Sequence, residues 1–184
     1  MKTFMKVCSV VLVLALAVAL CDLAQARVRA PRHHTSQEQT QGQQPAATQQ
    51  PREIRTEYFS LPLTDGWTLL KPVRAHAGSV DVILGSPKKN GAIAINVMKA
   101  NMSAAEIAGN MRANMQKDGA TVGELTEKDG LQEFDFTRQR AKGRAWIGAN
   151  GKAAAVVTIF GEQEMAKEVL KKLEPKAPGL FPKF

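Results

Sequence analysis

The stretch GRAWIGANGKAAAVVTIF, residues 143–160, decides the fold of this chain of 184 residues. Asn150-Gly151 at its centre is typical of a two-residue β-hairpin loop, because both residue types tolerate positive φ. Such a loop places Trp146 opposite Ala155, and the alternation of side chains then gives the hairpin two faces that are both apolar. Strands that are apolar on both faces are covered on both faces. The sequence therefore predicts that this hairpin lies in the middle of a sheet.

Further strands and two helices are predicted around this hairpin. Ser103 and Glu106 match a capping box at the start of the first helix. The second helix is expected from Gln163 to about Leu173, because Pro175 cannot continue it. The sequence therefore predicts an α+β fold, in which an antiparallel sheet is flanked by helices on both faces as an α/β/α sandwich. The expected strands are residues 58–61, 67–70, 80–84, 92–97, 121–127, 131–138, 143–149 and 153–160.

Residues 1–26 have the order of features that is typical of a secretory signal peptide. Lys2 and Lys6 give a basic start, an apolar run follows at residues 7–20, and Ala24-Gln25-Ala26 is a small-x-small cleavage site. The apolar run is too short to cross a bilayer of about 30 Å as a helix. We therefore expect the protein to reach the periplasm or to be secreted after the signal peptide is cleaved.

Two parts are predicted after the signal peptide. Residues 27–54 are rich in Gln and Pro and poor in large apolar side chains, so we expect a flexible linker there. Residues 55–184 are expected to form a single domain, which is large enough to fold without a disulfide. Both cysteines, Cys8 and Cys21, lie in the signal peptide. The alternative to complete cleavage is a lipoprotein anchored through Cys21, whose surroundings resemble a bacterial lipoprotein box.

Positive charge exceeds negative charge without gathering in one long run. Lys and Arg number 25 against 17 Asp and Glu, a formal net charge of +8. Removal of the signal peptide, which contains Lys2, Lys6 and Asp22, leaves +7. Such a spread favours solubility and weak attraction to anionic surfaces over nucleic-acid binding. Export also argues against a nucleic-acid partner.

The densest cationic cluster lies at a predicted hairpin tip beside an aromatic residue. Guanidinium groups suit carboxylate or phosphate partners, so the cluster indicates a binding site for an acidic protein surface, a lipid head group or another anionic ligand. The alternative is a solubilising tip that prevents strands of two molecules from pairing. The residues of this candidate site are Arg138, Arg140, Lys142, Arg144 and Trp146.

Catalytic and metal-binding patterns are weak in this sequence. His76 is the one histidine of the predicted domain, and no G-x-S-x-G motif accompanies it. Glu133 and Asp135 share one face of a predicted strand, and paired carboxylates can hydrolyse glycosides. The neighbours His33 and His34 lack further metal ligands. We therefore expect no enzyme, no cofactor and no metal site, and keep a small periplasmic hydrolase that uses His76 or the two carboxylates as the alternative.

Several short motifs together resemble the PsbP/DcrB-like group of small exported domains. The resemblance covers about residues 57–175 and implies an α/β/α sandwich with a role in binding or assembly at the outer side of a membrane. It implies no catalytic residue. The motifs are Tyr58-Phe59-Ser60-Leu61-Pro62, Asp65-Gly66-Trp67, the capped helix at Ser103, Phe134-Asp135-Phe136, and the hairpin from Gly143-Arg144-Ala145-Trp146 to Asn150-Gly151.

The sequence thus leads to one main functional hypothesis and two alternatives. The main hypothesis is an exported, non-enzymatic binding or assembly domain of a bacterial cell envelope, which recognises a protein or an anionic ligand. Peripheral association with a membrane is compatible with it. The alternatives are the small hydrolase and a carrier that holds an apolar ligand between sheet and helix.

Overall fold

The computed structural model describes residues 52–64 and 66–184. The predicted signal peptide with Cys21, most of the predicted linker and the His33-His34 pair lie outside the described residues. The elements of the described chain follow in this order: β1 (Glu53–Arg55), β2 (Phe59–Pro62), β3 (Thr68–Leu69), β4 (Arg74–His76), β5 (Ser79–Gly85), β6 (Gly91–Lys99), α2 (Ala104–Lys117), β7 (Thr121–Val122), β8 (Thr126–Lys128), β9 (Leu131–Arg138), β10 (Ala141–Ala149), β11 (Ala153–Gly161), α3 (Gln163–Leu170) and β12 (Glu174–Pro175).

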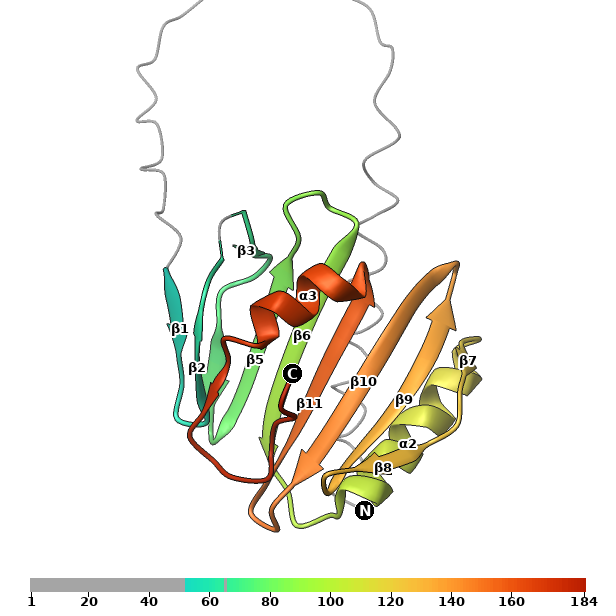
Figure 1. Ribbon diagram of the computed structural model, residues 1–184. Coiled ribbons are helices and arrows are strands. Elements are labelled where there is room, and N and C mark those ends of the chain that lie inside the picture. The colour runs from blue at the N-terminus through green and yellow to red at the C-terminus, as the bar shows by residue number, and fades with distance from the viewer. Residues whose placement is uncertain (1–51, 65) are drawn as a thin grey trace, which may run out of the picture. The chain divides into compact units, whose positions relative to one another are not determined.

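Nine strands form one antiparallel sheet, the main sheet, in the order β3-β5-β6-β11-β10-β9-β7 (Figure 1). Strand β4 pairs with β5, and β8 pairs with β9. The predicted central hairpin is confirmed, because β10 and β11 lie in the middle of this order. Its side chains are buried on both faces: Trp146 on one face is 7% exposed and Ile147 on the other is 0% exposed. We call the face that carries Trp146 face one and the other face two.

The register of this hairpin differs from the prediction by two residues. Trp146 pairs with Val157 rather than with Ala155. The turn lies one residue further along the chain, because the Asn150 backbone N–H donates to Ala153 O at 3.1 Å and leaves Gly151 and Lys152 between them. Asn150 Oδ1 also accepts from the backbone N–H groups of Lys152 and Ala153, at 3.1 and 3.0 Å. A shift by two positions leaves every side chain on its predicted face, since strand side chains alternate with a period of two.

Two helices occur in the described chain, both close to their predicted positions. The capping box of α2 is confirmed: the Ser103 hydroxyl accepts from the Glu106 backbone N–H, and the Glu106 carboxylate accepts from the Ser103 N–H. Helix α2 packs against β7, β9 and β10, whereas α3 packs against β6 and β11. The two helices lie on opposite sides of the sheet (Figure 1). Neither of them has the length and hydrophobicity that a transmembrane helix needs.

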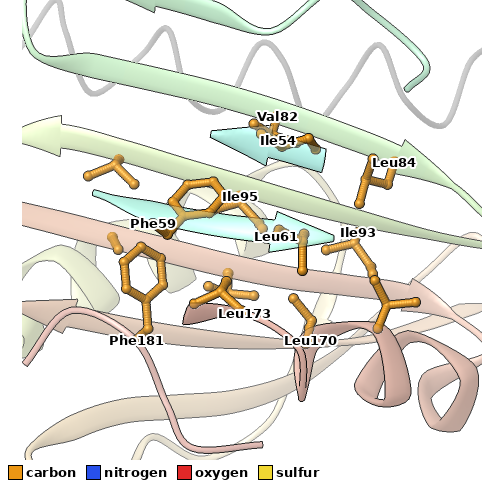
Figure 2. Close-up of a cluster of buried hydrophobic side chains, with 14 of the residues drawn as sticks. Ile54, Phe59, Leu61, Val82, Leu84, Ile93, Ile95, Leu170, Leu173 and Phe181 are labelled. Atoms are coloured by element: carbon orange, nitrogen blue, oxygen red, sulfur yellow. The ribbon is translucent and has the colours of Figure 1, made fainter. Parts of the chain in front are cut away.

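A second, three-stranded sheet of order β1-β2-β12 covers part of face one. Ile54 pairs with Leu61 in this sheet, and β12 joins β2 through the pair Glu174 and Ser60. The apolar side chains of β1 and β2 point into one buried cluster with those of β5, β6, α3 and Phe181 (Figure 2). Ile54 is 2% exposed, so the folded part begins inside the predicted linker, at β1.

The predicted α/β/α sandwich, which the PsbP/DcrB-like resemblance also implied, is wrong. The fold is a nine-stranded antiparallel sheet with a three-stranded sheet beside it, and its helices have only 14 and 8 residues. Neither helix forms a complete layer. The cover over face one comes largely from the three-stranded sheet and from Leu180 and Phe181, which are 1% and 8% exposed. Apolar strand faces demand a cover, but they do not specify that helices provide it.

Candidate functional site

The predicted cationic cluster lies where β9 turns into β10, at one end of the main sheet. Arg138 pairs with Ala141, so that Gln139 and Arg140 form a two-residue turn with positive φ values of 47° and 73°. Arg140 and Lys142 are exposed, and Arg138 is half-buried. We call residues 138–142 the β9–β10 tip. The hairpin tip predicted from the sequence is therefore present.

The register divides four of the five predicted residues between the two faces, while Arg140 lies in the turn. Arg138 follows Phe136 by two positions and so shares face two with it, whereas Lys142 and Arg144 share face one with Trp146. The cations of this cluster therefore surround the end of the hairpin instead of forming one flat patch.

Arg144 is bound to an acidic neighbour on face one. Its Nε donates to Asp135 Oδ1 at 2.6 Å and its Nη2 to Asp135 Oδ2 at 2.7 Å, a two-point geometry that suits guanidinium and carboxylate. The guanidinium also lies 6.0 Å from the ring centre of Trp146, which in turn packs edge-on against Phe184. Trp146 is 7% exposed. Arg144 and Trp146 are thus engaged within the domain, and three free cations remain at the tip.

Arg138, Arg140 and Lys142 are those three cations. Within residues 52–64 and 66–184, ion pairs form at Arg55, Arg144, Lys167 and Lys171, and at none of these three. An exposed cation without an acidic neighbour is available to an external anion.

Asp135→Asn is expected to lower the free energy of unfolding by about 0.5–1 kcal/mol at neutral pH, because the ion pair with Arg144 is partly exposed. The hydrogen bonds from Arg144 lower the pKa of the Asp135 carboxyl below its ordinary value. The stabilisation is therefore full above the unfolded-state pKa of about 4 and is lost as the pH falls through the lower folded-state pKa. Urea unfolding of both proteins from neutral to acid pH measures this. A deficit that stays constant into strong acid would contradict the ion pair.

The two candidate sites of the hydrolase alternative lie apart in the main sheet. Glu133 and Asp135 share face one of β9, as predicted. His76 lies in β4, at one edge of the main sheet, and β5, β6, β11 and β10 separate it from Glu133 in β9. Asp135 is bound to Arg144, so it is no free carboxylate partner for Glu133. In the described part of the chain, no group of three His, Cys, Asp or Glu side chains could hold a metal ion.

A groove of about 480 Å³ opens at the other end of the main sheet, and sequence reasoning did not find it. It lies between the start of α2 and the loops that join β8 to β9 and β10 to β11. The capping box already uses the Ser103 hydroxyl, and Gln132 Nε2 donates to Glu127 at 2.9 Å. Its wall combines polar with apolar side chains, among them Met102 and Ala149. Its lining residues are Asn101, Met102, Ser103, Ala104, Ala105, Glu127, Gly130, Gln132, Ala149 and Gly151.

A second cationic tip joins β5 to β6. We call residues 87–90 the β5–β6 tip; its Lys88 and Lys89 are exposed, and Lys89 has a φ of 57°. Ser86 holds this loop, because its Oγ accepts from the backbone N–H groups of Asn90 and Gly91 at 3.2 and 3.0 Å. The sequence signal was present in the adjacent lysines, but only the structure places them near the β9–β10 tip.

Comparison with known proteins gives little further guidance. No protein-family model matches the chain, and no curated protein matches it. Among solved structures, the chain is similar to a protein from Bacteroides thetaiotaomicron VPI-5482 at 20% sequence identity with a TM-score of 0.41. The match covers 72% of this chain and 52% of that one, so the chain spans about half the length of that protein.

Proposed function

We propose that this chain is an exported, non-enzymatic binding domain of the bacterial cell envelope, which recognises an anionic partner through the β9–β10 tip. The observation that supports it best is Arg140, which stands exposed at the apex of a turn, at positive φ and without an ion pair. The predicted signal peptide favours the envelope as the place of action. Membership of the PsbP/DcrB-like group stays a prediction.

The two ends of β9 carry the same kind of turn with different residues. At one end, Asp129 and Gly130 take the positive φ values of 54° and 76°, residue types that suit such a turn. At the other end, Gln139 and Arg140 do so, although a left-handed backbone costs such residues about 1 kcal/mol or more each. The fold itself does not need an arginine there. Backbone strain of this kind is concentrated at functional sites, which favours a contact role for Arg140.

A role in preventing strand pairing explains this residue less well. Charged residues that block pairing lie along the exposed edge of a sheet. Arg140 lies at the apex of a turn between β9 and β10, and both strands are already paired on both sides for part of their length. The position of Arg140 is better suited to a partner that approaches the end of the sheet.

The proposal predicts that two charge reversals at the tip abolish capture of the partner. Arg140→Glu with Lys142→Glu is the test variant, and Lys128→Glu with Lys152→Glu is its control. Lys128 and Lys152 are also exposed but lie in or next to the loops at the opposite end of β9 and β10. Both variants have the same net charge, so a difference between them reports position alone. The chain, as its host cell processes it, is immobilised and exposed to envelope extract at physiological salt.

We expect the wild-type protein and the control variant to retain the same component, and the tip variant to lose it. Salt screens interactions between distant exposed charges, so physiological salt weakens nonspecific attraction. Retention of the same component by the tip variant would overturn the proposed function. Circular dichroism of all three proteins shows whether the variants are folded.

A further inference from the structure

We propose that the partner is an anionic lipid surface, which the β9–β10 tip and the β5–β6 tip contact together. This inference rests on the proposed function and extends it from one tip to one end of the main sheet. It assigns five cations to the contact: Lys88, Lys89, Arg138, Arg140 and Lys142.

The strand register brings both tips to the same end of the sheet. Gly91, directly after the β5–β6 tip, pairs with Gly161, and Gly143, directly after the β9–β10 tip, pairs with Phe160. Both loops extend beyond the same end of the sheet in Figure 1. Three strand spacings of about 4.8 Å separate the two turns, which places them roughly 14 Å apart. A flat surface can therefore meet both tips at once.

Both tips are held in place before any partner binds. The Lys89 backbone N–H donates to Ser86 O at 3.0 Å, and Asn90 Nδ2 donates to Glu162 Oε2 at 2.6 Å. At the other tip, Arg138 and Ala141 close the two-residue turn. Because the backbone is already ordered, binding costs little further loop entropy.

The charge at this end suits a surface of many negative groups. Two acidic residues follow β11 at this end: the Glu162 carboxylate is hydrogen-bonded to Asn90, and the Glu164 carboxylate is paired with Lys167. The five cations of the two tips exceed these charges in number, and none of the five forms an ion pair within the described residues. Lys and Arg side chains near the surface of an anionic bilayer are attracted by its negative surface potential.

An exposed leucine favours a lipid surface over an acidic protein. Leu70 is 48% exposed, and no other large apolar side chain of the described residues is classed as exposed. It packs over Gly85, the last residue of β5 before the β5–β6 tip. A bilayer accepts both parts of such a surface, because its head groups attract the cations and its interface accommodates an apolar side chain.

The test measures cosedimentation of the chain, as its host cell processes it, with phosphatidylcholine vesicles that do or do not contain phosphatidylglycerol. Three variants of equal net charge are compared: Arg140→Gln with Lys142→Gln, Lys88→Gln with Lys89→Gln, and the control Lys128→Gln with Lys152→Gln. We expect the first two to bind the anionic vesicles about 30-fold more weakly than the wild type, and the control to bind like the wild type. Added salt should weaken binding of the wild type.

Each outcome bears on the inference. The inference is supported if binding requires phosphatidylglycerol and is weakened both by the variant of the β9–β10 tip and by the variant of the β5–β6 tip. Binding that depends on one tip alone, or that occurs equally on neutral vesicles, overturns it. If no vesicle binds but capture of a protein from envelope extract still depends on Arg140 and Lys142, the lipid inference fails while the proposed function stands. If neither vesicle binding nor capture of an extract component depends on the tips, both the lipid inference and the proposed function fail.

Discussion

Gly161→Ala is expected to lower the free energy of unfolding by at least about 3 kcal/mol, enough to reduce the melting temperature by about 10 °C. Gly161 ends β11 at a φ of 73°, and a Cβ atom there would lie 2.0 Å from Asn90 O. The obstacle is backbone, which cannot rotate away as a side chain does. The alanine would therefore have an unfavourable left-handed backbone conformation, and its Cβ atom would also force β11 away from the start of β6. Thermal and urea unfolding measure the loss.

Two other glycines provide matched controls for this variant. Gly151 also has a positive φ, 79°, but a Cβ atom there would meet nothing within 4 Å. Gly151→Ala should therefore cost only about 1 kcal/mol, the strain alone. Gly109 lies in α2 with open space around it, and Gly109→Ala should stabilise the protein by about 1 kcal/mol. Equal losses for Gly161→Ala and Gly151→Ala would show that close packing between β11 and the β5–β6 tip is absent.

The same contact links stability to the candidate site. The backbone N–H of Glu162 donates to Asn90 O at 3.3 Å, which fixes the end of β11 to the β5–β6 tip. A side chain at residue 161 would displace the β5–β6 tip from its position at this end of the main sheet. Gly161→Ala should for this reason be kept out of the set of variants that tests lipid binding.

Local features of the fold could be predicted from the sequence because their physical causes are local. Ser103 and Glu106 satisfy backbone donors within one helical turn, so the start of α2 was predicted correctly. Asp129-Gly130 forms a two-residue turn, since Lys128 pairs with Leu131, and these residue types are a local signal for such a turn. The faces of β10 and β11 were also predicted correctly, since alternation survives a shift of two residues.

The three-stranded sheet could not be predicted in the same way. Its strands have three, four and two residues, which is too short for a clear alternation. It also joins Ser60 to Glu174, whose pairing depends on the whole main sheet being in place. Without this sheet, the two predicted helices are the elements left to cover the main sheet, and the sequence pattern therefore leads to the α/β/α sandwich.

The candidate site was predicted in its residues but not in their contacts. The alternation of Arg138, Arg140, Lys142 and Arg144 indicated a hairpin tip, which the structure contains. Gln139-Arg140, however, is not a recognisable turn signal, so the register that places Arg144 opposite Asp135 was not available from the sequence. We expected Arg144 and Trp146 to bind a partner. Both instead make contacts within the domain, and those contacts result from this register.

Phe181→Ala is expected to lower the free energy of unfolding by about 3 kcal/mol, although Phe181 lies in a segment without regular secondary structure. Phe181 is 8% exposed and packs edge-on against Phe59 of the three-stranded sheet, with ring centres 5.4 Å apart. Its removal leaves a cavity between that sheet and face one, because the strands on either side are held by their own hydrogen bonds and cannot close over it.

Phe184→Ala is the matched control for Phe181→Ala. Phe184 is half-buried and contacts Trp146 edge-on at 5.1 Å, so its loss should cost only about 1 kcal/mol. Urea unfolding of both variants separates a buried anchor from a surface contact. If Phe181→Ala cost no more than Phe184→Ala, residues 180–181 would not be part of the core. Face one would then be covered by α3 and the three-stranded sheet alone, without a contribution from residues 180–181.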